Sequence, residues 1–322
     1  MKKWVLGLIG LLAAVGLIGY GVAAHNQQVA RETASHRRAV QAASARQATS
    51  KRRAAAKAQA AKAQAAKQAA AKQQAAKQQA AAVTAQPLPQ GTNHAATAAA
   101  YAHPAQAVHD TMFSRFDPAQ PKVVYLTFDD GPNLTMTPKI LAVLQAAKVP
   151  ATFFVIGQQI GASTAPMLRA EYDAGHAIGL HSFTHTYGFE INGDAAATAR
   201  ELNQTLAAVR SVLGPGFATQ AWRYPGGHMS WHHLQAPDAV IAQAGMSWID
   251  WNAASGDALG ASSPTTVPAM LAYHEQSIHA YGDHNSTVVL MHDAPDKTTT
   301  LAALPQIIAY YQQHGYQFGV IE

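Results

Sequence analysis

The chain has 322 residues, enough for one large domain or two ordinary ones, and it carries 23 basic and 18 acidic side chains. It contains no cysteine, which excludes disulfides, thiolate zinc sites and a cysteine nucleophile. The charge is uneven, because residues 1–82 hold 14 of the basic side chains and a single acid, so the remainder of the chain is acidic.

The N-terminus begins with a hydrophobic segment. Lys2 and Lys3 precede an uncharged apolar run of 21 residues from Trp4 to Ala24. A membrane-spanning helix needs about 20 such residues, so residues 1–24 are expected to anchor the chain with the lysines inside. The small residues up to Ala24 also suit a cleaved signal peptide, after which the protein would be secreted. Both alternatives place the rest of the chain outside the cytoplasm.

Residues 25–82 are a low-complexity segment of Ala, Gln, Lys and Arg. These residues favour helix, but Leu, Ile and aromatic residues are absent, so no coiled-coil seam is possible. We expect an exposed, fluctuating helical spacer that holds a domain away from the membrane. An alternative is a basic arm that contacts an anionic wall polymer or lipid, and no nucleic acid partner is expected.

Residues 83–118 contain four prolines and are expected to form a flexible linker. Ordered sequence is predicted to begin near Pro121, within a folded domain at 119–322. There, apolar runs alternate with helical patterns. Strands are predicted at 122–128, 151–156, 176–181, 219–223, 246–251, 287–292 and 317–321, and helices at 137–147, 163–173, 194–213, 237–244, 264–279 and 301–314. This alternation predicts an α/β fold with a parallel sheet.

Residues suited to chemistry fall at the ends of the predicted strands. Asp129 and Asp130 end the first strand in TFDDGP, and His181 and His185 follow the third in HSFTH. One carboxylate and two imidazoles make a three-ligand metal site, and the second carboxylate remains for proton transfer. The alternatives are an Asp-Gly turn with capping carboxylates and two unrelated histidines.

Two further segments carry candidates. Arg223 opens RYPGG, where a guanidinium beside a carboxylate keeps it ionised and the glycines let backbone N–H groups approach a ligand. His292 ends the run TVVLMH, a position suited to a general acid. Read in isolation, these residues also fit a surface arginine in a turn and a buried core histidine.

Taken together, TFDDGP, HSFTH, RYPGG and LMH resemble the polysaccharide deacetylases with a NodB homology domain, carbohydrate esterase family four. The four motifs occur in the family's order across residues 121–322. The resemblance implies a distorted seven-stranded (β/α) barrel and a divalent metal, usually zinc and sometimes cobalt or nickel.

By position, the resemblance implies metal ligation by Asp130, His181 and His185. It implies that Asp129 is the general base held by Arg223, and that His292 protonates the leaving amine. Substrate contacts are expected at four further positions: Gly226 through its N–H, Leu290 in the acetyl pocket, and Trp231 and Tyr187 as stacking candidates.

One position departs from the pattern. Ala254 falls where the family is expected to have an aspartate that polarises the acid histidine, and Ala258 where it has a tryptophan. Asp250, Asp257 or Asp293 would have to substitute, and without a carboxylate partner His292 would be a weaker acid–base group at neutral pH.

The expected function is hydrolysis of N-acetyl groups on a cell-wall polysaccharide, and the leading candidate substrate is peptidoglycan N-acetylglucosamine. One alternative is an O-acetyl esterase on xylan or another acetylated polymer, whose alkoxide leaves more readily than an amine. A further alternative is a wall protein that binds glycans without catalysis.

Overall fold

A computed structural model describes residues 91–188, 192–280 and 282–322, together with six single residues near the N-terminus. The chain divides into two compact units, Met1–Gln79 and Ala80–Glu322. The six single residues belong to the first unit and are helical and exposed: Arg31, Arg38, Lys57, Gln59, Gln64 and Lys67. The predicted anchor at 1–24 lies outside the described residues. Within the part that is described, no helix is long and apolar enough to cross a membrane.

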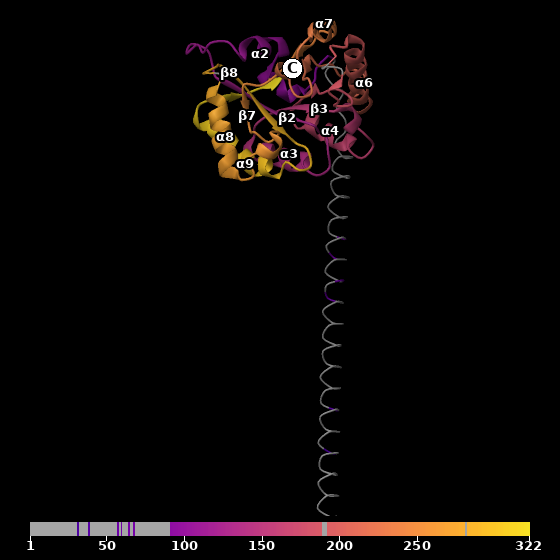
Figure 1. The fold of residues 1–322 in the computed structure, drawn as a ribbon, viewed down its shortest axis with the longest axis vertical. Helices are drawn as coiled ribbons and strands as arrows, with labels where there is room; N and C mark the ends of the chain where they lie inside the picture. The colour runs from indigo at the N-terminus through magenta and orange to yellow at the C-terminus, as the bar shows by residue number, and fades with distance from the viewer. Residues whose placement is uncertain are drawn as a thin grey trace, which may run out of the picture. The chain divides into compact units, whose positions relative to one another are not determined.

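The second unit is built on a curled parallel sheet (Figure 1). Its strands are paired in the order β6-β5-β4-β3-β2-β8-β7, and β9 pairs with the beginning of β2. The bounds are β2 Val123–Asp129, β3 Thr152–Val155, β4 Ala177–Leu180, β5 Ala221–Trp222, β6 Ser247–Trp248, β7 Ala253–Ala254, β8 Ser286–His292 and β9 Gln317–Phe318. Among the described residues no pairing joins β6 to β7, so the barrel is distorted and open there, as the fold prediction expected.

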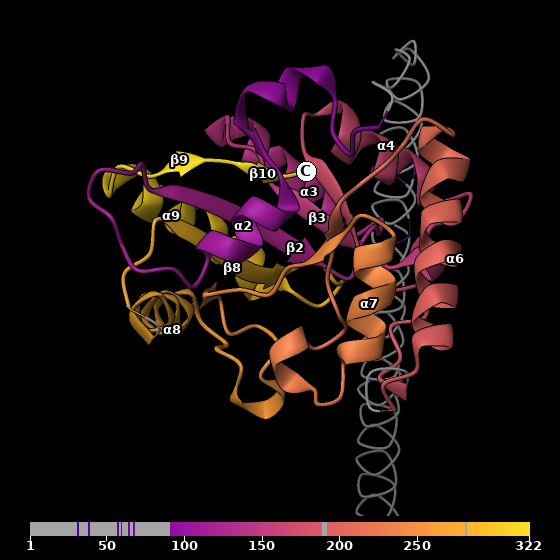
Figure 2. The same cartoon turned by 90° about the horizontal axis from the view of Figure 1, so that it is seen from above.

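Helices cover the outside of the sheet (Figure 2). They are α3 Thr137–Ala147, α4 Ala165–Asp173, α6 Ala195–Leu213, α7 Gln235–Gln243, α8 Val267–Ala280 and α9 Thr298–Gln313. α6 packs beside α7 at one side and α8 beside α9 at the other. Local sequence sets the boundaries: the Asp194 carboxylate accepts a hydrogen bond from Ala197 N and starts α6.

The central strand β2 shows why the sheet is buried on both faces. All seven of its residues are buried, as expected for a parallel strand covered on each side. Alternate side chains enter two different clusters: Val124, Leu126 and Phe128 pack with the outer helices, and Val123 and Tyr125 pack in the barrel interior. The strand therefore ends in a fixed position, with Asp129 directly at the edge of the core.

The folded unit begins earlier than the sequence predicts. A 3-10 helix at Ala96–Tyr101, strand β1 Ala102–His103 and helix α2 Ala105–Thr111 precede β2, and β1 pairs with β10 Val320–Ile321. Val108 and Met112 pack into the interior cluster with Tyr125. The expectation of a flexible linker is therefore wrong for residues 91–118. Pro104, one of the prolines on which it rested, is the residue that precedes α2.

The predicted strands and helices are otherwise all present, with two differences. The last predicted strand is divided into β9 and β10. Strand β7 was not predicted, because its two alanines form no apolar run of their own.

Candidate active site

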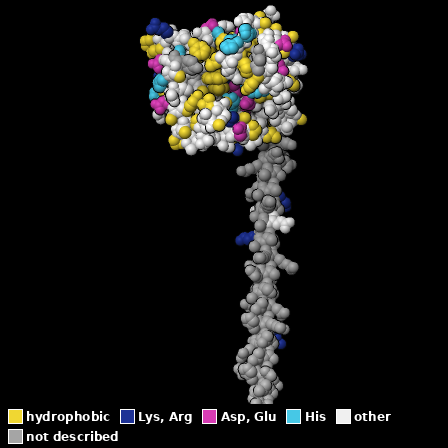
Figure 3. Space-filling model, viewed as in Figure 1, with side chains coloured by type: hydrophobic (Ala, Val, Ile, Leu, Met, Phe, Trp, Pro, Cys, Tyr) yellow, Lys and Arg dark blue, Asp and Glu magenta, His cyan; other side chains and the backbone are white. Residues whose placement is uncertain are grey.

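A cavity of about 280 Å³ opens at the carboxyl ends of the strands. Figure 3 shows apolar side chains gathered around the hollowed middle of this face, with acidic and histidine side chains beside them. Asp129 ends β2, His181 follows β4, Arg223 follows β5 and His292 ends β8. Parallel strands present their carboxyl ends at one edge, which brings these distant segments together.

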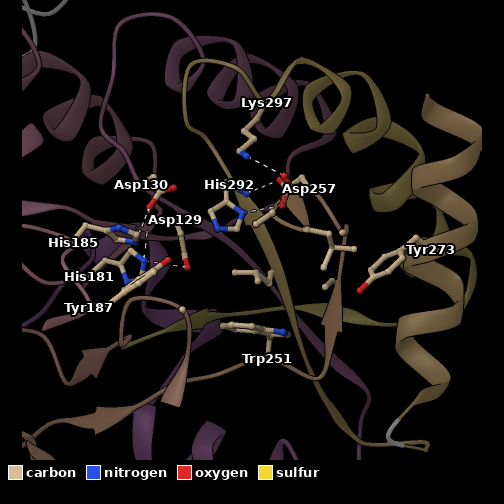
Figure 4. A pocket seen from close by; sticks show the side chains of 16 residues that line it. Asp129, Asp130, His181, His185, Tyr187, Trp251, Asp257, Tyr273, His292 and Lys297 are labelled. Carbon is tan, nitrogen blue, oxygen red and sulfur yellow. Dashed lines mark hydrogen bonds and ion pairs between the residues drawn. The ribbon is translucent and has the colours of Figure 1, made fainter. Parts of the chain in front are cut away.

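Asp130, His181 and His185 form a three-ligand cluster at this edge (Figure 4). One ligand atom of each lies within 4.8 Å of the others. The Nε2 of His185 is 3.4 Å from Oδ1 of Asp130, and the Nε2 of His181 is 3.8 Å from the same oxygen. That Oδ1 atom is buried and has no hydrogen-bond partner. A buried carboxylate oxygen facing two imidazole nitrogens fits a divalent cation.

The histidines are oriented by the protein. Nδ1 of His181 lies 2.9 Å from the carbonyl oxygen of Arg223, which leaves Nε2 to face Asp130. Burial lowers the pKa of His181 to about 3, so the neutral, metal-binding form prevails. On the HSFTH loop, the carboxylate of Glu201 accepts hydrogen bonds from the backbone N–H groups of Phe183 and Thr184 at 2.7 and 2.8 Å. Glu201 thereby fixes the loop that carries His185.

Asp129 also lies beside His181, with Oδ2 3.6 Å from Nε2, but unlike Asp130 it is held by an arginine. Oδ1 of Asp129 accepts a hydrogen bond from Nη1 of Arg223 at 2.8 Å. Arg223 is completely buried, and its other donors go to Thr127 and to the carbonyl oxygens of Ile249 and Asp250. Its guanidinium is 4.0 Å from the centre of the Phe154 ring. Arg223 therefore holds the Asp129 carboxylate in one orientation, with Oδ2 left toward the cavity.

His292 has a carboxylate partner, and it is Asp257. Nδ1 of His292 lies 2.8 Å from Oδ1 of Asp257, and the backbone N–H of His292 donates to Oδ2 at 2.9 Å. Thr300 donates to the same Oδ2, and Nζ of Lys297 donates to the Asp257 carbonyl. Of the three acids that could substitute at this position, Asp257 is therefore the one that reaches the ring, three residues beyond Ala254.

The other two substitutes considered for that partner lie elsewhere. Asp250 accepts hydrogen bonds from the backbone N–H groups of His228 and Met229. Asp293 accepts from the hydroxyl of Thr137 and is fully buried. Both acids therefore have structural partners of their own.

The Asp257 pair changes the proton affinity of His292. Burial by itself lowers the pKa of His292, but the hydrogen bond and charge of Asp257, with the charges of Asp129 and Asp130, raise it to about 9. For Asp257, burial raises the pKa, but the hydrogen bonds and charge of His292 and the hydrogen bond from Thr300 together outweigh burial and leave the pKa lowered. The pair therefore favours a protonated imidazole beside an ionised carboxylate in the metal-free site.

Three of the four predicted substrate contacts line the cavity, and the fourth does not. Gly226, Leu290 and Tyr187 line the cavity, and Tyr187 is 46% exposed. Trp231 is not among the residues that line it; its Nε1 donates to the Pro225 carbonyl at 2.8 Å, and its ring lies 5.1 Å from that of Tyr187. Trp231 therefore contacts the Tyr187 ring and is partly buried. Its place in a polar run had suggested a more exposed side chain.

Several residues at the cavity were not among the predicted site residues. Lys297, Trp251 and Tyr273 line the cavity, and Glu201 binds the HSFTH loop. Glu201 and Tyr273 lie within helices, Lys297 directly precedes one, and no short motif marks any of the three. Asp257 was visible only as one of three possible acids.

Comparison with known proteins agrees with this geometry. Residues 117–247 match the family model described as Polysaccharide deacetylase. The chain is 34% identical over 202 residues to "Putative polysaccharide deacetylase YheN" of Bacillus subtilis, covering 62% of this chain and 67% of the relative. It is 29% identical to "Peptidoglycan-N-acetylglucosamine deacetylase" of Bacillus cereus, covering 66% and 73% of the two chains.

A solved structure extends the likeness to the fold. The Streptococcus mutans structure described as a CE4 esterase matches with 44% identity and a TM-score of 0.69. The match covers 74% of this chain and all of that one.

Proposed function

The chain belongs to the polysaccharide deacetylase family, and on that premise we propose that it removes N-acetyl groups from peptidoglycan N-acetylglucosamine. Membership makes the protein a hydrolase of acetylated polysaccharide. Two observations support the narrower polymer. A relative from Bacillus cereus is named for this reaction. The apolar and basic N-terminal segments also suit a protein tethered at a cell wall.

The residues around the cavity have separate roles in the proposed amide hydrolysis. Asp130, His181 and His185 would hold a divalent ion, which would supply Lewis acidity to the acetyl carbonyl and to a water molecule. Asp129, fixed by Arg223, accepts the proton of the attacking water. The backbone at Gly226 lines the cavity where the developing oxyanion needs N–H donors.

The observation that carries the proposal is the pairing of His292 with Asp257 opposite the three-ligand cluster. An amine is a poor leaving group until it is protonated. His292, kept protonated by Asp257, donates that proton as the C–N bond breaks. The free amine and acetate then leave the cavity.

Zinc is the metal we propose, with cobalt and nickel as alternatives. Two imidazole nitrogens and one carboxylate oxygen are a donor set that zinc accepts at catalytic sites. The same set tolerates other first-row ions, so occupancy in the cell also depends on metal supply.

The test uses the purified full-length protein with N-acetylglucosamine oligomers and peptidoglycan. We expect acetate release that stops with a chelator and returns when zinc is added. If no acetate is released from either substrate while zinc is bound, the proposal fails.

The Asp257 pair weakens the case for an O-acetyl esterase. An alkoxide needs less help from His292 than an amine does, so the departure at Ala254 favoured that alternative, and Asp257 now supplies the carboxylate partner. Rates of acetate release from matched N-acetyl and O-acetyl oligosaccharides distinguish the two activities. A much higher rate from the O-acetyl substrate would favour the esterase. A glycan-binding protein without catalysis would show no acetate release in either series.

We also propose that residues 1–24 anchor the protein outside the cytoplasm, with residues 25–82 as a spacer. The basis is the length of the apolar run and the two lysines before it. Membrane fractionation followed by sequencing of the mature N-terminus tests this. A soluble protein that starts after Ala24 would replace the anchor with a cleaved signal.

A further inference from the structure

A second cavity lies behind the active site. It measures about 240 Å³ and lies between β7 and α8, and Trp251, Ala254 and Tyr273 line both cavities. We infer that the acyl pocket continues into this space, so that the enzyme also removes acyl groups longer than acetyl, such as propanoyl and butanoyl, from amino sugars. The inference rests on the proposed function and adds a substrate class to it.

One of the residues that line both cavities has a small side chain, Ala254. Ala254 of β7 is paired with Leu290 of β8, which lines the active-site cavity beside His292. Ala254 presents only a methyl group there. Its backbone N–H donates to the hydroxyl of Ser277 at 2.9 Å, and its carbonyl oxygen lies 3.1 Å from both that hydroxyl and Nδ1 of His274. The single proton of the hydroxyl also has the His274 carbonyl within 2.7 Å. The polar groups at this point are satisfied between β7 and α8, so an apolar chain can pass without leaving them unpaired.

Two aromatic rings, those of Trp251 and Tyr273, line both cavities. Tyr273 reaches from α8 toward the cavity, and Trp251 lies below it in Figure 4. The Tyr273 ring rests on Gly256, where an added Cβ would lie 2.7 Å from Cδ1 of the ring. Gly256 also has a φ of +79°, which glycine adopts most readily. The ring therefore packs against one wall, and the second cavity offers methylene groups the Trp251 and Tyr273 rings and the methyl groups of Ala253, Ala254 and Ala280, with Gln276 and Ser277 as its polar lining.

The reaction remains the same hydrolysis. The water oxygen bonds to the acyl carbon, the C–N bond breaks, the amine takes a proton, and propanoate or butanoate leaves in place of acetate. A pocket closed behind the acetyl methyl would reject each added methylene by roughly 10- to 200-fold. A pocket that continues should show little of this penalty.

The test uses glucosamine tetramers that are fully N-acetylated, N-propanoylated or N-butanoylated. The zinc-loaded full-length protein is assayed for free amine. We expect kcat/KM for the butanoyl tetramer within about tenfold of the acetyl value. If the acetyl tetramer is hydrolysed and kcat/KM for the butanoyl tetramer is below about one hundredth of the acetyl value, the inference is overturned and the proposed function stands. Hydrolysis of none of the three overturns both.

A variant at the far end of the second cavity shows whether the chain occupies it. Ala280→Phe puts a ring into this space from the end of α8 and should lower the butanoyl-to-acetyl ratio about tenfold or more. The matched control is Ala272→Phe, an exposed position of the same helix that lines neither cavity, and it should leave the ratio unchanged.

Ala254→Val narrows the passage itself and should lower the same ratio, so the test holds if one variant fails to fold. An unchanged ratio in both variants would show that the longer chain does not enter the second cavity and would overturn the inference.

Discussion

Asp129 and Asp130 are adjacent in sequence and both lie near His181, whose Nε2 is 3.6 Å from Oδ2 of Asp129 and 3.8 Å from Oδ1 of Asp130, but each also has a partner of its own. Asp130 has a φ of +80°, which is uncommon outside glycine, and its Oδ1 faces His181 and His185. Asp129 is the last residue of β2 and accepts a hydrogen bond from buried Arg223. The turn therefore gives the proposed metal ligand and the proposed base different orientations within a single dipeptide.

Replacing Asp129 with Asn should remove the base and keep the metal. Proton transfer of this kind contributes roughly 10²–10⁴-fold, so we expect kcat to fall by about that factor. Bound zinc, measured by mass spectrometry, should stay at the wild-type level. The control is Asp283→Asn, whose side chain is mostly exposed. Near-normal turnover in Asp129→Asn would contradict the assigned role.

Replacing Asp257 with Asn should change the pH dependence. The wild-type pair raises the pKa of His292, so the protonated acid persists as pH rises and is lost only above that raised value. A neighbouring charge shifts a pKa by about 1–3 units, so the alkaline limb of kcat should move to lower pH by roughly that amount in Asp257→Asn. An alkaline limb at the wild-type position would show that Asp257 does not set it.

At the scale of elements, strands formed by long apolar runs were predictable from the sequence, and the short strand β7 was not. β2 and β8 are continuous buried strands, and their sequence patterns are unambiguous. β7 has two residues and is defined by its pairing with β8, a tertiary contact that no local pattern encodes. The same reason explains Asp257: its distance from His292 depends on how β7 and β8 align.

The N-terminal elements of the folded unit illustrate a second limit. Prolines between 87 and 118 suggested a linker, yet α2 packs Val108 and Met112 into the barrel interior. Proline at the start of a helix is compatible with it, so the composition alone was ambiguous.

Met112→Ala should therefore destabilise the folded unit. Met112 is completely buried, and such truncations cost about 2–5 kcal/mol. Urea unfolding followed by circular dichroism measures the change. Met229→Ala provides a control with the same chemistry at a residue that is 44% exposed. Equal stability of the two variants would mean that α2 adds nothing to the core.

At the scale of the whole molecule, charge separates the two parts of the chain. Residues 1–82 are basic, whereas the rest of the chain has 17 acids and nine bases. A basic segment next to an anionic wall or lipid surface gains an attraction that salt weakens.

Deleting residues 25–82 tests that contribution. If the spacer contacts an anionic polymer, the full-length protein should bind isolated cell walls at low salt and be released at high salt, and the deleted protein should bind weakly at both. Equal retention of the two proteins at every salt concentration would leave the segment as a spacer alone.

The central claim is that Asp130, His181 and His185 hold one divalent ion beside Asp129. Crystals grown with zinc test it most directly through anomalous scattering. We predict one peak at about 2.0–2.2 Å from a carboxylate oxygen of Asp130 and from Nε2 of both histidines. A zinc-loaded, active crystal with its peak elsewhere, or with Asp130 outside coordinating distance, would contradict the account.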